Sequence, residues 1–136
     1  MTAVNEVMTH DPRTVTAQTS VAEAARLMRD DEVGSLPVVE GERLVATVTD
    51  RDIALRVVAE SRPAETSVGE IASRELVTID PQQPVEEAMR LMAEHQVRRL
   101  PVCEEDGRLV GIVAQADVAR HASEERAGEI VERISE

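Results

Sequence analysis

The chain contains the same segment twice, and this internal repeat constrains its fold more than any other feature. A unit of roughly 60 residues buries little apolar surface alone, so we expect the two copies to pack on each other. A cleft between the copies is where a ligand would bind. The equivalent segments are residues 21–28 with 85–92 and 36–38 with 100–102, offset by 64, and residues 43–48 with 108–113, offset by 65.

Each copy predicts the same order of elements. Apolar residues at helical spacing follow a capping Ser20 in the first copy and Pro84 in the second, and β-branched runs bounded by turn residues predict strands. The expected extended segments are 14–16, 33–38, 44–49, 76–79, 97–102 and 109–114; the closing helices are 50–59 and 117–121; amphipathic turns lie at 3–8 and 67–72. The predicted fold class is therefore α+β, with tandem β-α-β-β-α repeats packed with pseudo-two-fold symmetry into one module.

The repeat also sets the expected boundaries. We assign residues 1–62 to the first repeat, 63–121 to the second and 122–136 to an acidic C-terminal tail or helix. Residues 60–66 form a polar linker that is too short to let the repeats move as independent domains. Apolar residues recur at helical spacing in the terminal segment, so it is either a solvated tail or a helix that docks one face. These residues are Ile130, Val131 and Ile134.

Composition narrows the classes of partner. The chain has no Phe, Tyr or Trp and a formal net charge of -12, which disfavours base stacking and attraction to nucleic acid or anionic lipid. No apolar run approaches the ~18 residues that span a bilayer and no leader is present, so we expect a cytoplasmic protein without membrane association.

Metal, redox and catalytic chemistry also lack a recognisable pattern. The three histidines have no ligand spacing, so no metal site is predicted, and the single cysteine, Cys103, is expected to be a small buried side chain. A small metal or redox protein is the least favoured alternative. No nucleophile elbow, phosphate-binding loop or suitably spaced carboxylate pair is present, so we predict that the protein is not an enzyme.

The most informative polar cluster is Thr49-Asp50-Arg51-Asp52, where a predicted strand turns into a helix. The Thr49 hydroxyl and the amides of the first helical turn can donate to a phosphate, because those amides lack intrahelical partners. Arg51 can add charge-assisted bonds, and Asp52 has two acceptor oxygens that match the vicinal hydroxyls of a ribose. The cluster indicates a nucleotide site. The alternative is that Thr49 or Asp50 merely caps the helix.

Jointly and in this order, the motifs resemble a pair of CBS domains standing alone, without an attached enzyme or channel. The resemblance covers almost all of residues 1–121, and is greatest to short actinobacterial proteins of the hypoxic-response type. It rests on the two Leu-Pro-Val strand entries, on residues 49–52 and 95–102, and on Gly111-Ile112-Val113 followed by Asp117. It implies a module that binds adenosine nucleotides, most often AMP, ADP or ATP and sometimes S-adenosylmethionine or NAD, in two clefts between its repeats.

The resemblance also implies a role for each matching residue. Thr49 would hold phosphate and Asp52 the ribose hydroxyls, while Arg98 and Arg99 match positions from which basic side chains reach phosphates. Adenine would lie against aliphatic side chains and backbone, which suits a chain without aromatic residues. The segments concerned are Val15-Thr16 and Leu36-Pro37-Val38.

The second site departs from this pattern. Ala114 stands where the first copy has Thr49, Gln115-Ala116 replace Asp50-Arg51, and only Asp117 is retained. This degenerate site, which would also include Ile79 and Pro101, is expected to be weak, empty or adapted to an uncharged adenosine group. We predict at most one tightly bound nucleotide per chain.

The predicted function is a regulatory sensor of adenosine nucleotides with one intact site. The alternative is a ligand-free dimeric scaffold or interaction protein with a vestigial cleft. A homodimer is expected on either interpretation, because the family pairs its modules through helices. No cofactor is predicted to be obligatory. The sequence identifies neither the nucleotide nor a protein partner.

Overall fold

The structure, a computed structural model, describes residues 2–135, except for the side chains of residue 126 and of residues 128–135. The helices are α1 (Val21–Asp31), α2 (Asp50–Ile53), which continues as a π-helical turn (Ala54–Val58), α3 (Val85–His95) and α4 (Gln115–Ser135). The strands are β1 (Thr9–His10), β2 (Ser35–Glu40), β3 (Arg43–Thr49), β4 (Arg99–Cys103) and β5 (Leu109–Ala114), and short 3-10 helices span Val4–Glu6 and Val68–Glu70.

This order confirms the predicted α+β class, with two corrections. Residues 14–16 and 76–79 do not form strands: each contributes one parallel bridge, Val15 to Val38 and Ile79 to Val102. A turn begins directly after the first bridge, where the Thr16 amide donates to Thr19 Oγ1. The last helix was expected at 117–121 and instead runs from Gln115 to Ser135, so the backbone of the terminal segment is helical. The side chains at 130, 131 and 134 lie outside the described residues.

The two long helices of the repeats begin and end by local chemistry that repeats at the same offset. Ser20 caps α1 by accepting a hydrogen bond from the Glu23 amide, whereas Pro84 precedes α3 without a side-chain cap. Both helices end at a residue in the left-handed conformation, Glu32 and Gln96, each with φ 55°. The next residue, a valine in both copies, donates its amide back to a carbonyl of the last turn, which turns the chain toward the following strand.

The chain folds into two compact units that do not coincide with the sequence repeats. One unit contains residues 13–76 and 106–109, and the other contains residues 2–12, 77–105 and 110–135. Residues 63–76 therefore pack with the first repeat, and residues 2–12 pack with the second. The exchange is reciprocal. Ser67 forms an antiparallel β-bridge with Ser20 before α1, and the equivalent Ala3 forms one with Pro84 before α3.

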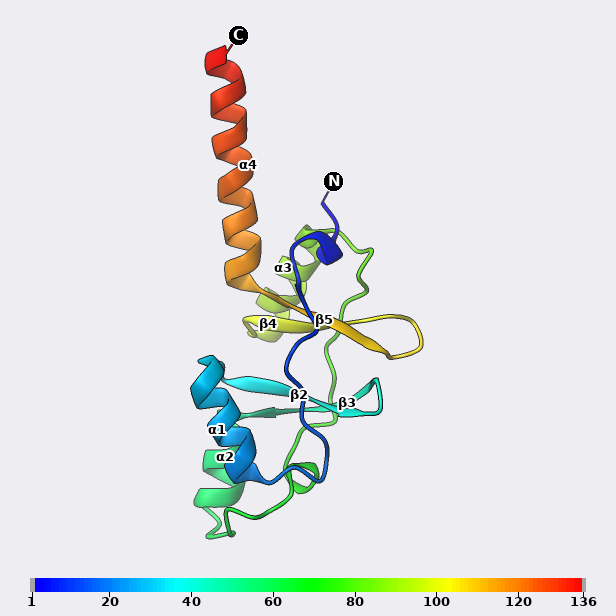
Figure 1. Cartoon of the computed structure of the whole chain (residues 1–136), viewed down its shortest axis with the longest axis vertical. Coiled ribbons are helices and arrows are strands. Elements are labelled where there is room, and N and C mark those ends of the chain that lie inside the picture. The colour runs from blue at the N-terminus through cyan, green and yellow to red at the C-terminus, as the bar shows by residue number, and fades with distance from the viewer. Residues whose placement is uncertain (1, 136) are drawn as a thin grey trace. The chain divides into compact units, whose positions relative to one another are not determined.

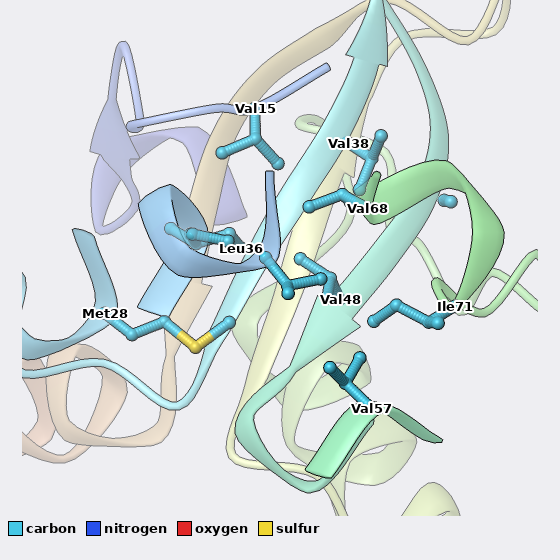
Figure 2. Packing of buried hydrophobic residues seen from close by; sticks show 11 residues of the cluster. Val15, Met28, Leu36, Val38, Val48, Val57, Val68 and Ile71 are labelled. Carbon is cyan, nitrogen blue, oxygen red and sulfur yellow. The ribbon is translucent and has the colours of Figure 1, made fainter. Parts of the chain in front are cut away.

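The unit that contains the first repeat is built on the antiparallel β2–β3 hairpin, with α1 and α2 beside it (Figure 1). Residues 63–76, which the first unit takes from the second repeat, are called the exchanged segment. Its side chains Val68 and Ile71 point toward Val48 in the core of this unit (Figure 2). Ile71 is 1% exposed and Val68 is fully buried. The aliphatic core expected from a chain without aromatic residues is thus completed by a segment from the start of the second repeat.

The other unit contains a three-stranded sheet in the order β1-β5-β4, with α3 and the first turns of α4 packed against it. Val4 of the N-terminal 3-10 helix is fully buried in its core, in the place that Val68 takes in the first unit. Gly111 lets β1 approach β5, because a Cβ at this position would lie 2.8 Å from the Thr9 carbonyl oxygen. The antiparallel pairing of Thr9 with Ile112 therefore fixes the N-terminal segment to this sheet.

Candidate functional site

The predicted phosphate and ribose residues lie at the junction of β3 and α2. The Asp52 amide donates to Thr49 Oγ1 at 3.0 Å, and Asp52 Oδ2 accepts from the Thr49 amide at 2.9 Å. The Asp50 amide donates to the Gly34 carbonyl at 2.9 Å, which holds the start of α2 against the entry to β2. The helix cap proposed as the alternative is therefore present, and it uses one oxygen of each side chain.

The cap leaves ligand-binding capacity on both side chains. Thr49 accepts in the cap, so its hydroxyl proton remains free to be donated. Asp52 Oδ1 accepts no hydrogen bond within the described residues, and its nearest cation is the Arg56 Nε at 3.8 Å. Arg56 itself donates to the Ile71 carbonyl at 3.1 Å. The Asp52 side chain is 15% exposed, so a bound hydroxyl would meet a partly desolvated carboxylate.

The aliphatic residues predicted near adenine lie in the same unit. Val15 pairs with β2 through its amide to the Pro37 carbonyl at 3.0 Å and its carbonyl to the Val39 amide at 2.8 Å. The side chains of Val15, Leu36 and Val38 belong to the hydrophobic core, and Pro37 is also buried. Thr16 is the exposed member of the predicted set.

The second repeat reproduces the backbone geometry without the hydroxyl. Asp117 Oδ2 accepts from the Ala114 amide at 3.2 Å, and the Gln115 amide donates to the Arg98 carbonyl at 2.8 Å. Ile79 takes the position of Val15: its amide donates to the Pro101 carbonyl at 3.1 Å.

The two aspartates differ in the hydrogen-bond partner of the carboxylate oxygen that the cap does not use, Oδ1. Asp117 Oδ1 accepts from Arg120 at 2.6 Å, whereas Leu55 stands at the position equivalent to Arg120 in the first repeat. The two carboxylates are almost equally exposed, at 15% for Asp52 and 16% for Asp117. The sequence analysis missed Arg56 and Arg120, although the spacing of an acid and a base by three or four residues on a helix is a visible signal.

The structure thus distributes the predicted residues over both compact units. Thr49, Asp50, Arg51 and Asp52 lie at one end of β3, with Arg51 exposed. Arg98 and Arg99 lie at the start of β4 in the other unit, where both are exposed. That unit also holds the residues of the degenerate site, which are Ala114, Asp117, Ile79 and Pro101.

Two further titratable side chains, His121 and Cys103, lie in the unit that contains the second repeat. His121 Nε2 lies 3.1 Å from Thr2 Oγ1 and 3.1 Å from Glu125 Oε1. Burial raises the pKa of the Cys103 thiol to about 11. Among the side chains that the structure describes, no three His, Cys, Asp or Glu residues gather as a metal site. No helix within the described chain has the length and apolarity needed to cross a membrane.

Comparison with known proteins finds the same family in both halves. The CBS domain matches residues 4–59 and 68–124. The chain is 45% identical to the CBS domain-containing protein YhcV of Bacillus subtilis, over 99% of this chain and 96% of that protein. It is 36% identical to hypoxic response protein 1 of Mycobacterium tuberculosis, over 98% of this chain and 94% of that protein.

Solved structures of similar fold include liganded modules. The crystal structure of hypoxic response protein I with two coordinated zinc ions has a TM-score of 0.80 at 37% identity, covering 88% of this chain and 98% of that one. CBSX2 in complex with AMP has a TM-score of 0.81 at 28% identity, covering 93% and 99%. The CBS domain pair of protein MJ0100 in complex with 5-methylthioadenosine and S-adenosyl-L-methionine has a TM-score of 0.79 at 27% identity, covering 92% of this chain and 98% of that one.

Proposed function

The chain belongs to the CBS domain family, and on this premise we propose that it is a regulatory module that binds one adenosine nucleotide per chain. Related modules bind AMP in one case and methylthioadenosine with S-adenosylmethionine in another. The observation that carries the proposal is the cap at Thr49 and Asp52, which leaves one hydroxyl proton and one carboxylate oxygen for a ligand. Those two groups match a phosphate and a ribose hydroxyl, respectively.

In this proposal Asp52 Oδ1 accepts from the ribose, and the Thr49 hydroxyl donates to the phosphate together with a free amide of the first turn of α2. Arg51 adds positive charge beside that turn, and Arg98 and Arg99 stay predicted phosphate contacts from the second repeat. Because the chain has a net charge of -12, these arginines offset a field that would otherwise repel an anionic ligand. Adenine is expected to contact the backbone of residues 15–16 and 36–38.

The second repeat is proposed to bind no nucleotide tightly. Ala114 offers no hydroxyl, and Arg120 competes with a ribose for Asp117 Oδ1. An exposed ion pair of this kind is worth about 0–1 kcal/mol. Competition with Arg120 therefore lowers the affinity of the second repeat for an uncharged adenosine group by up to roughly fivefold. The missing phosphate donors of residues 114–116 are the larger loss.

The proposed role is regulatory, without catalysis or an obligatory cofactor. A nucleotide that binds one conformation of a homodimer better than another shifts their populations, and a protein partner can respond to that shift. The coupling equals the difference in affinity for the two conformations, so no chemical step is required.

The ultraviolet spectrum of the gently purified protein tests this proposal directly. A chain without Phe, Tyr or Trp has almost no absorbance near 260 nm, so a peak there in stoichiometric amount would support an adenine ligand. Nuclease digestion beforehand excludes nucleic acid, and mass spectrometry of the released compound identifies the ligand. Calorimetric titration with AMP, ADP and ATP follows. A flat spectrum together with no heat for any of the three would overturn the proposal in favour of a dimeric scaffold.

A further inference from the structure

The exchanged segment, residues 63–76, contacts the backbone on both sides of the proposed nucleotide site. The Gly69 amide donates to the Ala17 carbonyl at 2.9 Å, directly after the residues predicted to contact adenine. A Cβ on Gly69 would lie 2.8 Å from the Ala17 Cβ, so this close approach needs a glycine. The Ser73 amide donates to the Thr47 carbonyl on β3 at 2.9 Å, close to the cap. The segment is therefore attached to both parts of the site.

A single side chain, Arg56, connects this segment with the proposed ribose acceptor. Its Nη1 donates to the Ile71 carbonyl at 3.1 Å, and its Nε lies 3.8 Å from Asp52 Oδ1. At 3.8 Å the guanidinium lies beyond hydrogen-bond distance, so it attracts the carboxylate and leaves Oδ1 free to accept a ligand hydroxyl. Arg56 lies in the π-helical turn Ala54–Val58, a rare backbone geometry that is frequent at functional sites.

The second repeat divides the same two contacts between two residues. His121 stands at the position of Arg56, and its Nε2 lies 3.1 Å from Thr2 Oγ1 in the N-terminal segment, residues 2–12. Asp117 is instead paired with the preceding residue, Arg120, at 2.6 Å, and the backbone there is α-helical. Within the described residues, one side chain that both pairs with the aspartate and holds the segment therefore occurs in the first repeat alone.

We propose that Arg56 is a positioning residue that couples occupancy of the nucleotide site to the attachment of the exchanged segment. This inference rests on the proposed function and adds how a bound ligand changes the rest of the chain. A ribose hydroxyl at Asp52 Oδ1 fixes the carboxylate, which restrains the guanidinium and, through it, the Ile71 carbonyl. The coupling is reciprocal, so a chain with the segment detached binds nucleotide more weakly by the same factor. At residue 77 the segment continues into the other unit.

Amide hydrogen exchange measured by NMR tests the coupling. The amides of Val68 and Gly69 report opening of the exchanged segment, and the equivalent amides of Val4 and Asn5 report opening of the N-terminal segment. The parent chain is compared with and without a saturating nucleotide, whichever of AMP, ADP and ATP gives the most heat in calorimetry. Exchange should slow about fivefold more in the exchanged segment than in the N-terminal segment. This is the lower end of coupling between sites, because Arg56 is 56% exposed.

Two variants separate this coupling from a general loosening of the segment. Arg56→Met removes both contacts, whereas the matched control Arg62→Met removes an exposed ion pair to Glu70 of the same segment, at 2.9 Å. Far-ultraviolet circular dichroism verifies that both variants fold. Arg56→Met should abolish the additional protection and lower nucleotide affinity about fivefold, as reciprocity requires. Arg62→Met should keep both the additional protection and the affinity.

The remaining outcomes would each overturn a different part of the reasoning. Additional protection that persists in Arg56→Met removes the role of Arg56, and its loss in both variants assigns the effect to the stability of the segment in general. Equal protection of both segments in a parent chain that binds nucleotide removes the coupling and leaves the proposed function intact. A parent chain that gives no heat with any of the three nucleotides removes the proposed function and the coupling with it.

Discussion

Replacing Asp52 with Asn separates the two uses of this side chain. The amide retains a carbonyl oxygen that can accept from the Thr49 amide, so the cap is largely preserved. The charge near the start of α2 is lost, which costs about 0.3–1 kcal/mol of folding free energy. The ligand loses a hydrogen bond to a charged acceptor, worth about 1.5–3 kcal/mol, so nucleotide affinity should fall roughly 10- to 150-fold.

Thermal unfolding converts this loss into a measurable shift. A nucleotide at 100 times the parent Kd stabilises the parent by about 2.7 kcal/mol, and the same concentration stabilises a variant with 100-fold weaker binding by about 0.4 kcal/mol. At about 4 °C per kcal/mol for a chain of this size, the ligand-induced rise in Tm falls from about 11 °C to about 2 °C. Scanning calorimetry or circular dichroism is the assay, because the chain lacks tryptophan and tyrosine fluorescence.

Asp117→Asn is the matched control. Its carboxylate accepts from the Ala114 amide in the same geometry and is almost equally exposed. The loss of unliganded stability should therefore match that of Asp52→Asn, with up to about 1 kcal/mol more because the exposed pair with Arg120 is weakened as well. The ligand-induced rise in Tm should remain that of the parent chain. An equal fall in both variants would refute the assignment of a single site, and an unchanged rise in Asp52→Asn would refute the ribose role.

Three further predictions follow from other parts of the structure. Arg120→Leu copies the first repeat and frees Asp117 Oδ1, so calorimetry with adenosine should detect additional binding at the second repeat; an unchanged isotherm would contradict the competition described above. Ile71→Ala should lower the free energy of unfolding by about 2–5 kcal/mol in a urea titration, while the control Leu76→Ala, at a position 39% exposed, should cost less than about 1 kcal/mol; similar losses would contradict the core role of the exchanged segment. Burial raises the pKa of Cys103 from about 9 to about 11, so the thiol loses its proton at lower pH in the unfolded chain than in the folded one. The contribution of this difference to folding stability is complete below pH 9 and is lost as pH rises through 11. The free energy of unfolding should decline by up to about 1.4 kcal/mol per pH unit in this window, and a decline that persists in Cys103→Ala would assign the effect to other groups.

The sequence was sufficient to predict the family and most helices and strands, but residues 14–16 and 76–79 form bridges instead of strands, and β1 was not predicted. The spacing of apolar residues located α1 and α3, and turn residues located the hairpins, because these signals are local. The family resemblance is confirmed by the CBS domain match in both repeats. The length of α4 was not predicted, because residues 122–136 are rich in charge and carry few apolar residues, which a solvated tail also shows.

The exchange of segments between the units could not be predicted from the repeat. Ala3 and Ser67 are equivalent, as are Ser20 and Pro84, so pairing within one repeat and pairing across repeats satisfy the same pattern. Val4 and Val68 are likewise both valine, and either can fill either core. The side chains do not show which segment pairs with which helix start, so only the three-dimensional packing distinguishes the two pairings.

The two copies provide an internal control for the site itself. The aspartate is kept in both, and in both it accepts from the amide at the end of the preceding strand, so the fold alone is a sufficient reason for its presence. The threonine is not needed for that geometry, because Ala114 reaches it without a hydroxyl. Thr49 Oγ1 also caps α2, so its oxygen has a structural use, but its proton takes no part in that cap. A phosphate that accepts this proton would give the hydroxyl a second use. An aspartate at this position identifies the module, whereas the preceding hydroxyl distinguishes the repeat proposed to bind nucleotide from the repeat proposed to be degenerate.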